Sequence, residues 1–143
     1  MIFSIFLVIF SGCEKTPETK ELFSGGFSFD FSFNISESSF CGTLRKDVGG
    51  CYEITFNTPS SVSALSFVYL SGNMTVIYDN LDRFEAGKPP QKSAVGILCL
   101  PFEQAERNGS LSGENYKITT KNNLPIKLLS NGIIVEIENF AKK

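Results

Sequence analysis

The chain has 143 residues, a formal net charge of −2, and neither histidine nor tryptophan. A weakly acidic chain without a basic stripe argues against a nucleic-acid partner, because such binding rests on neutralising phosphates. The absence of histidine excludes Ser-His-Asp and Cys-His catalysis and removes the commonest metal ligand. We therefore expect no enzyme, no cofactor and no metal site.

The N-terminus has the pattern of a secretory signal. Residues 2–10 are apolar, Ser11-Gly12-Cys13 follow, and the chain then becomes polar at once. The apolar run is shorter than the roughly 20 residues that a membrane-spanning helix needs, and it fits the core of a signal peptide, which has about 7–15 residues. The pattern resembles the signal of bacterial lipoproteins, in which two small residues precede a cysteine that is acylated and begins the mature chain.

This resemblance divides the chain. Residues 1–12 are expected to form the signal peptide, with Ser11 and Gly12 as its processing residues, and Cys13 to carry the lipid. Polar residues 14–25 are typical of a flexible tether, and residues 26–143 have the size of a single domain. The protein is then expected at the cell membrane, lipid-anchored on the extracytoplasmic face. The first residues lack the usual lysine or arginine, and the alternative is a fortuitous apolar N-terminus or a first strand.

Five strands are predicted in the first half of the domain. Phenylalanine alternates with polar residues from Phe27 to Ile35, and a period of two is typical of a half-buried strand. Four more alternating segments, separated by turns, follow at residues 40–46, 51–57, 64–70 and 74–79. Because the turns between most of these strands are short, we expect an antiparallel meander.

One helix and three more strands are predicted in the second half. Residues 80–90 are expected to be irregular, and residues 91–107 carry apolar side chains at helical spacing. Pro101 should kink or split this helix, and Asn108-Gly109 should end it. Strands with hairpin turns between them are then expected at residues 115–120, 124–129 and 133–140.

These elements predict a mainly β (α+β) fold. A curved antiparallel sheet or half-barrel of about eight strands, with one apolar helix inserted between strands five and six, lets every strand bury its apolar face. A closed barrel plugged by the helix is the alternative.

The cysteines of the domain are expected to be free thiols. Cys41, Cys51 and Cys99 are an odd set. The first two flank a predicted hairpin, but its alternation places Arg45 near Cys51 or Glu53, so the cysteines are several residues out of register. At about 3.4 Å per residue, their separation exceeds the roughly 7 Å between Cα atoms that a disulfide allows.

The order of elements resembles the small lipoproteins of the LolA/LolB-like class, in which an open half-barrel encloses a hydrophobic cavity partly covered by helices. The chain is more similar still to short lipoproteins of Gram-positive gut anaerobes. The likeness is carried by the signal and by residues 54–59, 65–69, 72–76 and 121–128. It implies a concave surface that holds acyl chains, although this chain offers one helix where the carriers have several.

Two functions follow. The first is a membrane-anchored lipoprotein that binds a lipid or another hydrophobic ligand on its concave face, lined by Phe29, Phe31, Phe33, Tyr52, Ile54, Phe56, Tyr69, Ile118, Ile126, Leu128 and Val135. The alternative is a protein-interaction or structural module of the cell envelope that has a packed core and uses a sheet edge. An enclosed apolar cavity favours the first function, and a packed interior with an open edge strand favours the second.

Overall fold

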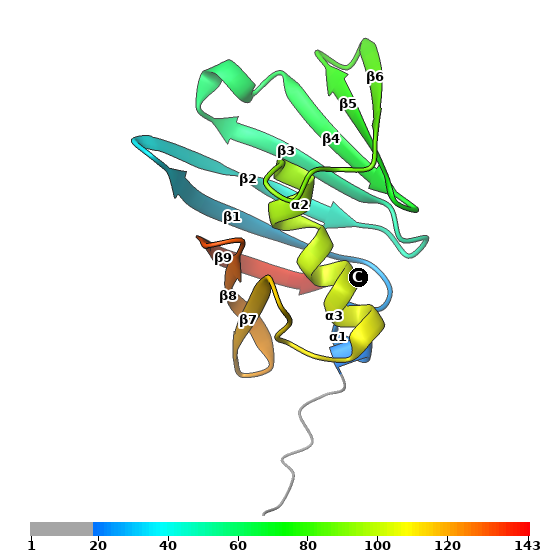
Figure 1. Cartoon of the computed structure of the whole chain (residues 1–143), viewed down its shortest axis with the longest axis vertical. Helices are drawn as coiled ribbons and strands as arrows, with labels where there is room; N and C mark the ends of the chain where they lie inside the picture. The colour runs from blue at the N-terminus through cyan, green and yellow to red at the C-terminus, as the bar shows by residue number, and fades with distance from the viewer. Residues whose placement is uncertain (1–18) are drawn as a thin grey trace, which may run out of the picture.

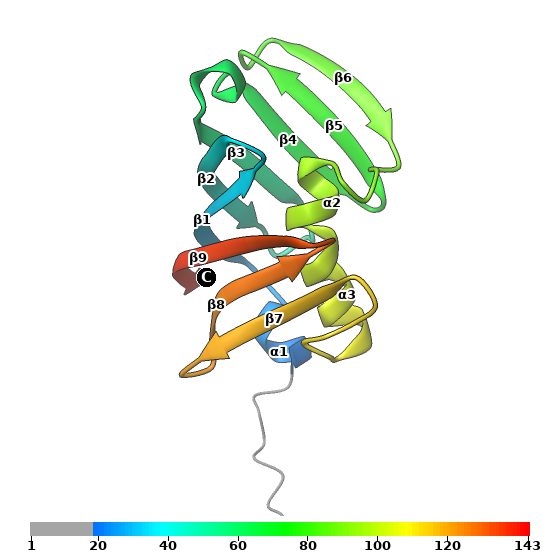
Figure 2. The same ribbon diagram turned by 60° about the vertical axis from the view of Figure 1, so that its left-hand side comes forward.

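The computed structural model describes residues 19–143, which form one nine-stranded antiparallel sheet curved around helices (Figures 1 and 2). The order of strands across the sheet is β6-β5-β4-β3-β2-β1-β9-β8-β7. Their bounds are β1 Phe27–Ile35, β2 Ser38–Lys46, β3 Tyr52–Thr58, β4 Leu65–Leu70, β5 Asn73–Tyr78, β6 Asp82–Gly87, β7 Tyr116–Lys121, β8 Leu124–Ser130 and β9 Ile133–Lys142. Among these residues, no helix is long and apolar enough to cross a membrane.

The sheet consists of two meanders joined in the middle. Strands β1 to β6 follow one another, as do β7 to β9, and β1 pairs with β9 through contacts such as Phe31 opposite Ile137. The chain therefore has to cross from the edge at β6 to the edge at β7. It does so through α2 (Ala94–Leu98) and α3 (Leu100–Asn108), which lie across the concave face of the sheet (Figure 2).

The mainly β, antiparallel fold confirms the sequence-based expectation, but the strand count differs. Residues 82–87, which we expected to be irregular, form β6, so the helices lie between strands six and seven rather than five and six. Asp79 and Asn80 adopt positive φ angles of 53° and 58° and turn the chain back onto β5. The strand escaped detection because three of its six residues are charged, as is common on a sheet edge.

The predicted helix is split, as Pro101 suggested. The first piece, α2, begins where the Ser93 hydroxyl accepts the Gly96 N–H (3.1 Å), and it ends at Cys99. Pro101 lies in the first turn of α3, where its missing N–H costs nothing. Gly109, with a φ of 65°, ends α3 in the left-handed conformation.

The tether prediction is wrong from residue 19 onward. Thr19–Phe23 form a short helix, α1, and the rings of Phe23 and Phe102 pack edge to face with centroids 5.2 Å apart. A helix of five residues is too short to show a periodic pattern, and tertiary packing alone stabilises it. The predicted signal, Cys13 and the tether up to residue 18 lie outside the described residues. A short 3₁₀ turn, Ser60–Val62, follows β3.

The core lies between the inner face of the sheet and α1, α2 and α3. The phenylalanines predicted to share one face of β1 are all buried, and Phe29 packs against Phe102 of α3 with ring centroids 5.2 Å apart. Phe27 contacts both Phe102 and Phe140. The alternation read from the sequence is thus confirmed, and it identifies the face that the helices cover.

A buried lysine ties three elements together. The side chain of Lys46, at the end of β2, is only 4% exposed. Its ammonium group donates to the Phe23 carbonyl of α1 (2.6 Å) and to the Glu106 carboxylate of α3 (3.0 Å). It also lies 5.6 Å from the ring centroid of Phe27 and 5.8 Å from that of Tyr52. These partners compensate for the loss of water around a buried charge.

Gly42 provides the first test of the sheet geometry. A Cβ atom at this position would lie 2.0 Å from the Thr55 carbonyl oxygen and 2.8 Å from the Phe31 ring, so Gly42→Ala should lower the free energy of unfolding by about 1–3 kcal/mol. Gly49→Ala is the control, because the only neighbour of its Cβ is the flexible Asp47 carboxylate in an exposed turn. Urea unfolding measures both variants, and equal midpoints would contradict the assigned register.

Lys46→Met tests the buried cation. The Phe23 carbonyl loses its donor and Glu106 its partner, so the free energy of unfolding should fall by about 1–3 kcal/mol. Arg107→Met is the control, because Arg107 is exposed and its helix pair with Glu103 should contribute only about 0.5 kcal/mol. A Lys46→Met variant as stable as the wild type in urea would mean that the cation does not hold α1 and α3.

Candidate functional site

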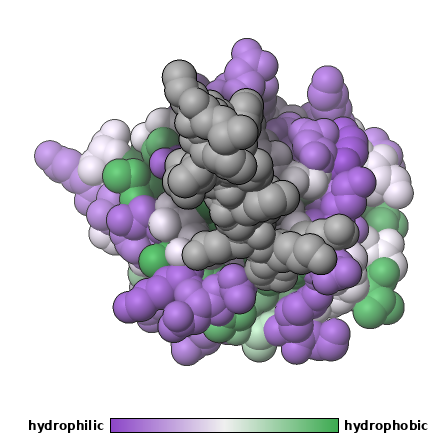
Figure 3. Space-filling model, turned by 90° about the horizontal axis from the view of Figure 1, so that it is seen from below, coloured by the Kyte–Doolittle hydropathy of each residue, from purple (hydrophilic) through white to green (hydrophobic). Residues whose placement is uncertain are grey.

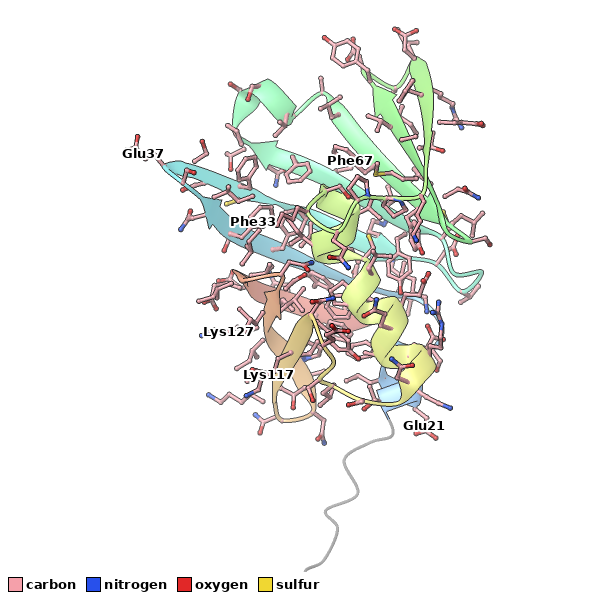
Figure 4. All side chains as sticks on the ribbon, viewed as in Figure 1. Glu21, Phe33, Glu37, Phe67, Lys117 and Lys127 are labelled. Atoms are coloured by element: carbon pink, nitrogen blue, oxygen red, sulfur yellow. The ribbon has the colours of Figure 1, made fainter. Side chains whose placement is uncertain are left out.

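The concave face, our first candidate for a ligand site, is filled by protein. Almost all of the predicted ligand-facing residues are buried against the helices or one another. They are Phe29, Phe31, Phe33, Tyr52, Ile54, Phe56, Tyr69, Ile118, Leu128 and Val135. Figure 4 shows Phe33 and Phe67 on the side of the sheet that faces α2, whereas Glu37 marks the tip of the β1–β2 hairpin. The inner face is therefore a packed core over most of its length.

Ile126 is the exception, and its predicted burial is wrong. The register of β7 and β8 shifts here, so that Thr119 pairs with Lys127 and Thr120 with Pro125, and Ile126 has no partner. A bulge of this kind adds one residue to a strand and breaks the alternation of its side chains. Pro125 is buried as a result, and Ile126 is 38% exposed.

Two hollows on the surface of residues 19–143 lie near the concave face and its helices, and neither is an enclosed apolar site. A groove of about 580 Å³ lies over β1, β2 and the start of β9, is open to solvent, and has no lining residue from α2 or α3. A smaller hollow of about 210 Å³ lies beside these helices and is lined partly by Lys88, Gln91 and Gln104. Neither resembles the enclosed cavity that acyl chains need.

Titratable side chains of β4 and α3 form a hydrogen-bonded network. The Tyr69 hydroxyl donates to the Glu103 carboxylate (2.9 Å), which also accepts from the Arg107 guanidinium (3.0 Å). Burial and this hydrogen bond raise the pKa of Tyr69, which keeps the hydroxyl protonated as a donor. The network thus joins β4 to α3.

The nearby thiol and phenol are not activated either. Cys99 is fully buried, and burial raises the pKa of its thiol, so the nucleophilic thiolate does not form. The Tyr52 hydroxyl is buried without a hydrogen-bond partner, and burial raises its pKa. Within residues 19–143, no cluster of histidine, cysteine, aspartate or glutamate could hold a metal ion.

Cys41, Cys51 and Cys99 are free, as expected. Arg45 pairs with Glu53 across the β2–β3 hairpin, one of the two predicted partners. A bulge between Cys41 and Gly42 places Cys41 opposite Thr58, at the end of β3 away from Cys51. The hairpin register thus keeps these two thiols apart.

The two edges of the sheet differ, and this difference marks the second candidate site. The edge at β7 is covered by residues 111–113: the Ile118 N–H donates to the Leu111 carbonyl (2.7 Å), and the Gly113 N–H donates to the Tyr116 carbonyl (2.9 Å). At the other edge, β6 pairs only with β5, and no other described backbone group bonds to it. The outer edge of β6 is therefore open.

Apolar side chains accompany this open edge. Tyr78 is 55% exposed, Leu81 80% and Phe84 68%. Phe84 pairs with Val76, which pairs with Phe67, so the three residues form one row on the inner face that runs outward past α2. We call β6 with Tyr78 and Leu81 the β6 edge. Sequence reasoning missed it because the charges of β6 hid the strand; the Asp79-Asn80 turn was the available signal.

The β6 edge lies at the end of the molecule far from α1, where the described chain begins (Figures 1 and 2). Figure 3 shows the opposite end, where hydrophilic side chains dominate the visible described surface and a few apolar ones lie between them. Lys117 and Lys127 lie outside the core, in the β7 and β8 part of the sheet (Figure 4). The predicted lipidation and processing residues, Cys13, Ser11 and Gly12, lie outside the described residues.

Comparison with known proteins extends the description of the fold. No family model and no curated protein matches the sequence. Eight chains of known structure match. One is the crystal structure of an uncharacterized conserved protein from Thermus thermophilus, which is 11% identical and superposes with a TM-score of 0.56 over 88% of this chain and 83% of that one. At this identity the likeness shows a shared fold.

Proposed function

We propose that this protein is a lipid-anchored module of the cell envelope that binds a protein partner through the β6 edge. The observation that carries the proposal is the open edge strand with an exposed phenylalanine, Phe84, at the end of the molecule far from α1. The packed interior favours this function over the carrying of a ligand.

The chemistry of an edge strand supports this role. Its unpaired N–H and C=O groups can bind an added strand, and side chains on alternate positions then select the partner. Asp82, Arg83 and Glu85 are exposed on β6, and charges at such an edge discourage indiscriminate pairing. The edge thus combines backbone groups, an apolar contact and charges that discriminate between partners.

The position of the anchor supports the same arrangement. With Cys13 acylated, residues 14–18 separate the lipid from α1 and reach roughly 20 Å at full extension. The end of the domain around α1 then lies near the membrane surface. The β6 edge, at the far end, faces away from the membrane and is accessible to partners.

A hydrophobic ligand on the concave face is the second candidate. The row formed by Phe67, Val76 and Phe84 favours it, because this row continues the inner face beyond α2. Ten of the eleven predicted ligand-facing residues are buried within the core, which argues for a smaller contact than an acyl carrier needs. A lipid that stays bound to the purified chain in native mass spectrometry, with Phe84→Ser abolishing it, would favour this candidate.

Acylation of Cys13 tests the proposed anchor. The wild type should partition with membranes and carry at least two acyl chains by intact mass, because one chain alone gives only marginal anchoring. Cys13→Ala should be unmodified and leave the membrane fraction, while Cys41→Ala, at a free cysteine of the domain, should behave as the wild type. An unmodified wild type would remove the anchor from the proposal.

Photo-crosslinking tests the β6 edge. A benzophenone amino acid at position 84 should give a discrete adduct in the native host, because this side chain is exposed beside the open strand. The same amino acid at Val48, which is 83% exposed in the β2–β3 turn, is the matched control. Adducts at both positions, or at neither, would contradict a specific contact at the β6 edge.

A further inference from the structure

We infer that the partner of the β6 edge is a second copy of this chain, bound by antiparallel pairing of the two β6 strands about a two-fold axis at Phe84. This inference rests on the proposed function, because it names the partner of the same edge. An open edge strand is a template for such pairing. A two-fold contact uses the same patch on both copies and closes after two, so it does not grow into fibres.

The sequence of β6 is complementary to itself in this register. With Phe84 opposite Phe84, antiparallel pairing places Arg83 of each copy opposite Glu85 of the other, and Asp82 opposite Ala86. Two opposite-charge pairs therefore form across the axis, and such cross-strand pairs stabilise a sheet. The two phenylalanine rings meet on the inner face beside the apolar row that ends at Val76.

The structure leaves these charges available. Arg83 pairs with Ile77 of β5 and Glu85 with Thr75, so both side chains project from the outer face of the sheet, opposite to Phe84. Both are exposed, and within residues 19–143 neither takes part in an ion pair. They can therefore pair across the axis without breaking an existing contact.

Neighbouring registers are disfavoured by the same charges or by the orientation of the apolar faces, and the register with Phe84 opposite Glu85 is disfavoured by its faces alone. An axis at Arg83 places two arginines opposite each other, and an axis at Glu85 places two glutamates together. A register with Arg83 opposite Phe84 brings Asp82 against Glu85 and turns the two apolar faces in opposite directions. Like charges directly opposite one another destabilise a strand pair. The register centred on Phe84 matches both the charges and the faces.

The position of the edge also sets how two anchored copies meet. Because β6 lies far from α1, the two-fold axis directs the two N-terminal ends away from each other (Figure 2). Copies held on facing surfaces can therefore pair edge to edge.

Sedimentation of the full chain in a density-matched non-ionic detergent tests the pairing. The wild type should form a concentration-dependent dimer. Arg83→Glu and Glu85→Arg should each weaken it about tenfold or more, since each places like charges opposite one another twice. The double variant Arg83→Glu/Glu85→Arg should restore the dimer, because it exchanges the charges and keeps every pair complementary. Arg45→Glu reverses the charge of an exposed side chain on β2, away from the β6 edge, and should leave the dimer unchanged.

The outcomes separate this inference from the proposed function. A wild type that stays monomeric at the highest soluble concentration overturns the second copy as partner, and adducts to another protein at position 84 would then leave the β6 edge as a binding site. A dimer that the single reversals do not weaken, or that the double variant fails to restore, overturns the register at Phe84. Circular dichroism of each variant establishes that the sheet is intact before the comparison is made.

Discussion

The architecture depends on covering one apolar sheet face. The inner side chains of β1 are phenylalanines, and water can be kept from them only by another layer of structure. The crossover through α2 and α3 supplies this layer, and it is required by the topology as well. Because β1 and β9 pair in the middle of the sheet, the chain has to pass from the β6 edge to the β7 edge, and it does so across the concave face. The same segment therefore connects the sheet edges and fills the space that a carrier would leave for its ligand.

Lys46 fixes the position of α1, and hence the end of the molecule at which the described chain begins. Its ammonium group joins the last residue of β2 to the Phe23 carbonyl of α1 and to Glu106 of α3. A buried cation without these partners would be costly, so α1 is held where the partners are satisfied. The described chain therefore begins at the end opposite to β6, and the proposed anchor at Cys13 would direct the open edge away from the membrane.

The charges of β6 have two consequences that follow from one pattern. They keep an open edge strand from pairing with any strand it meets, and their order makes the edge complementary to an antiparallel copy of itself. Residues 111–113 cover the edge at β7, so the edge at β6 is the one left open to a partner. Specificity here is a matter of which charges face each other, since the backbone groups of an edge strand are alike for every partner.

The sequence by itself determined the antiparallel strands with strong alternation, the split at Pro101 and the face of β1 that is buried, because these follow from local periodicity and from the fixed geometry of proline. Only the tertiary structure decided the rest. Strand β6 has no apolar pattern of its own and is stabilised by pairing with β5. Helix α1 is stabilised by the packing of Phe23 on Phe102. Ile126 is exposed because a bulge shifts the pairing of β7 and β8. Each depends on a partner distant in the chain or on a register that single-strand patterns do not encode. Whether the concave face is hollow or filled is decided in the same way, by the path of the crossover helices.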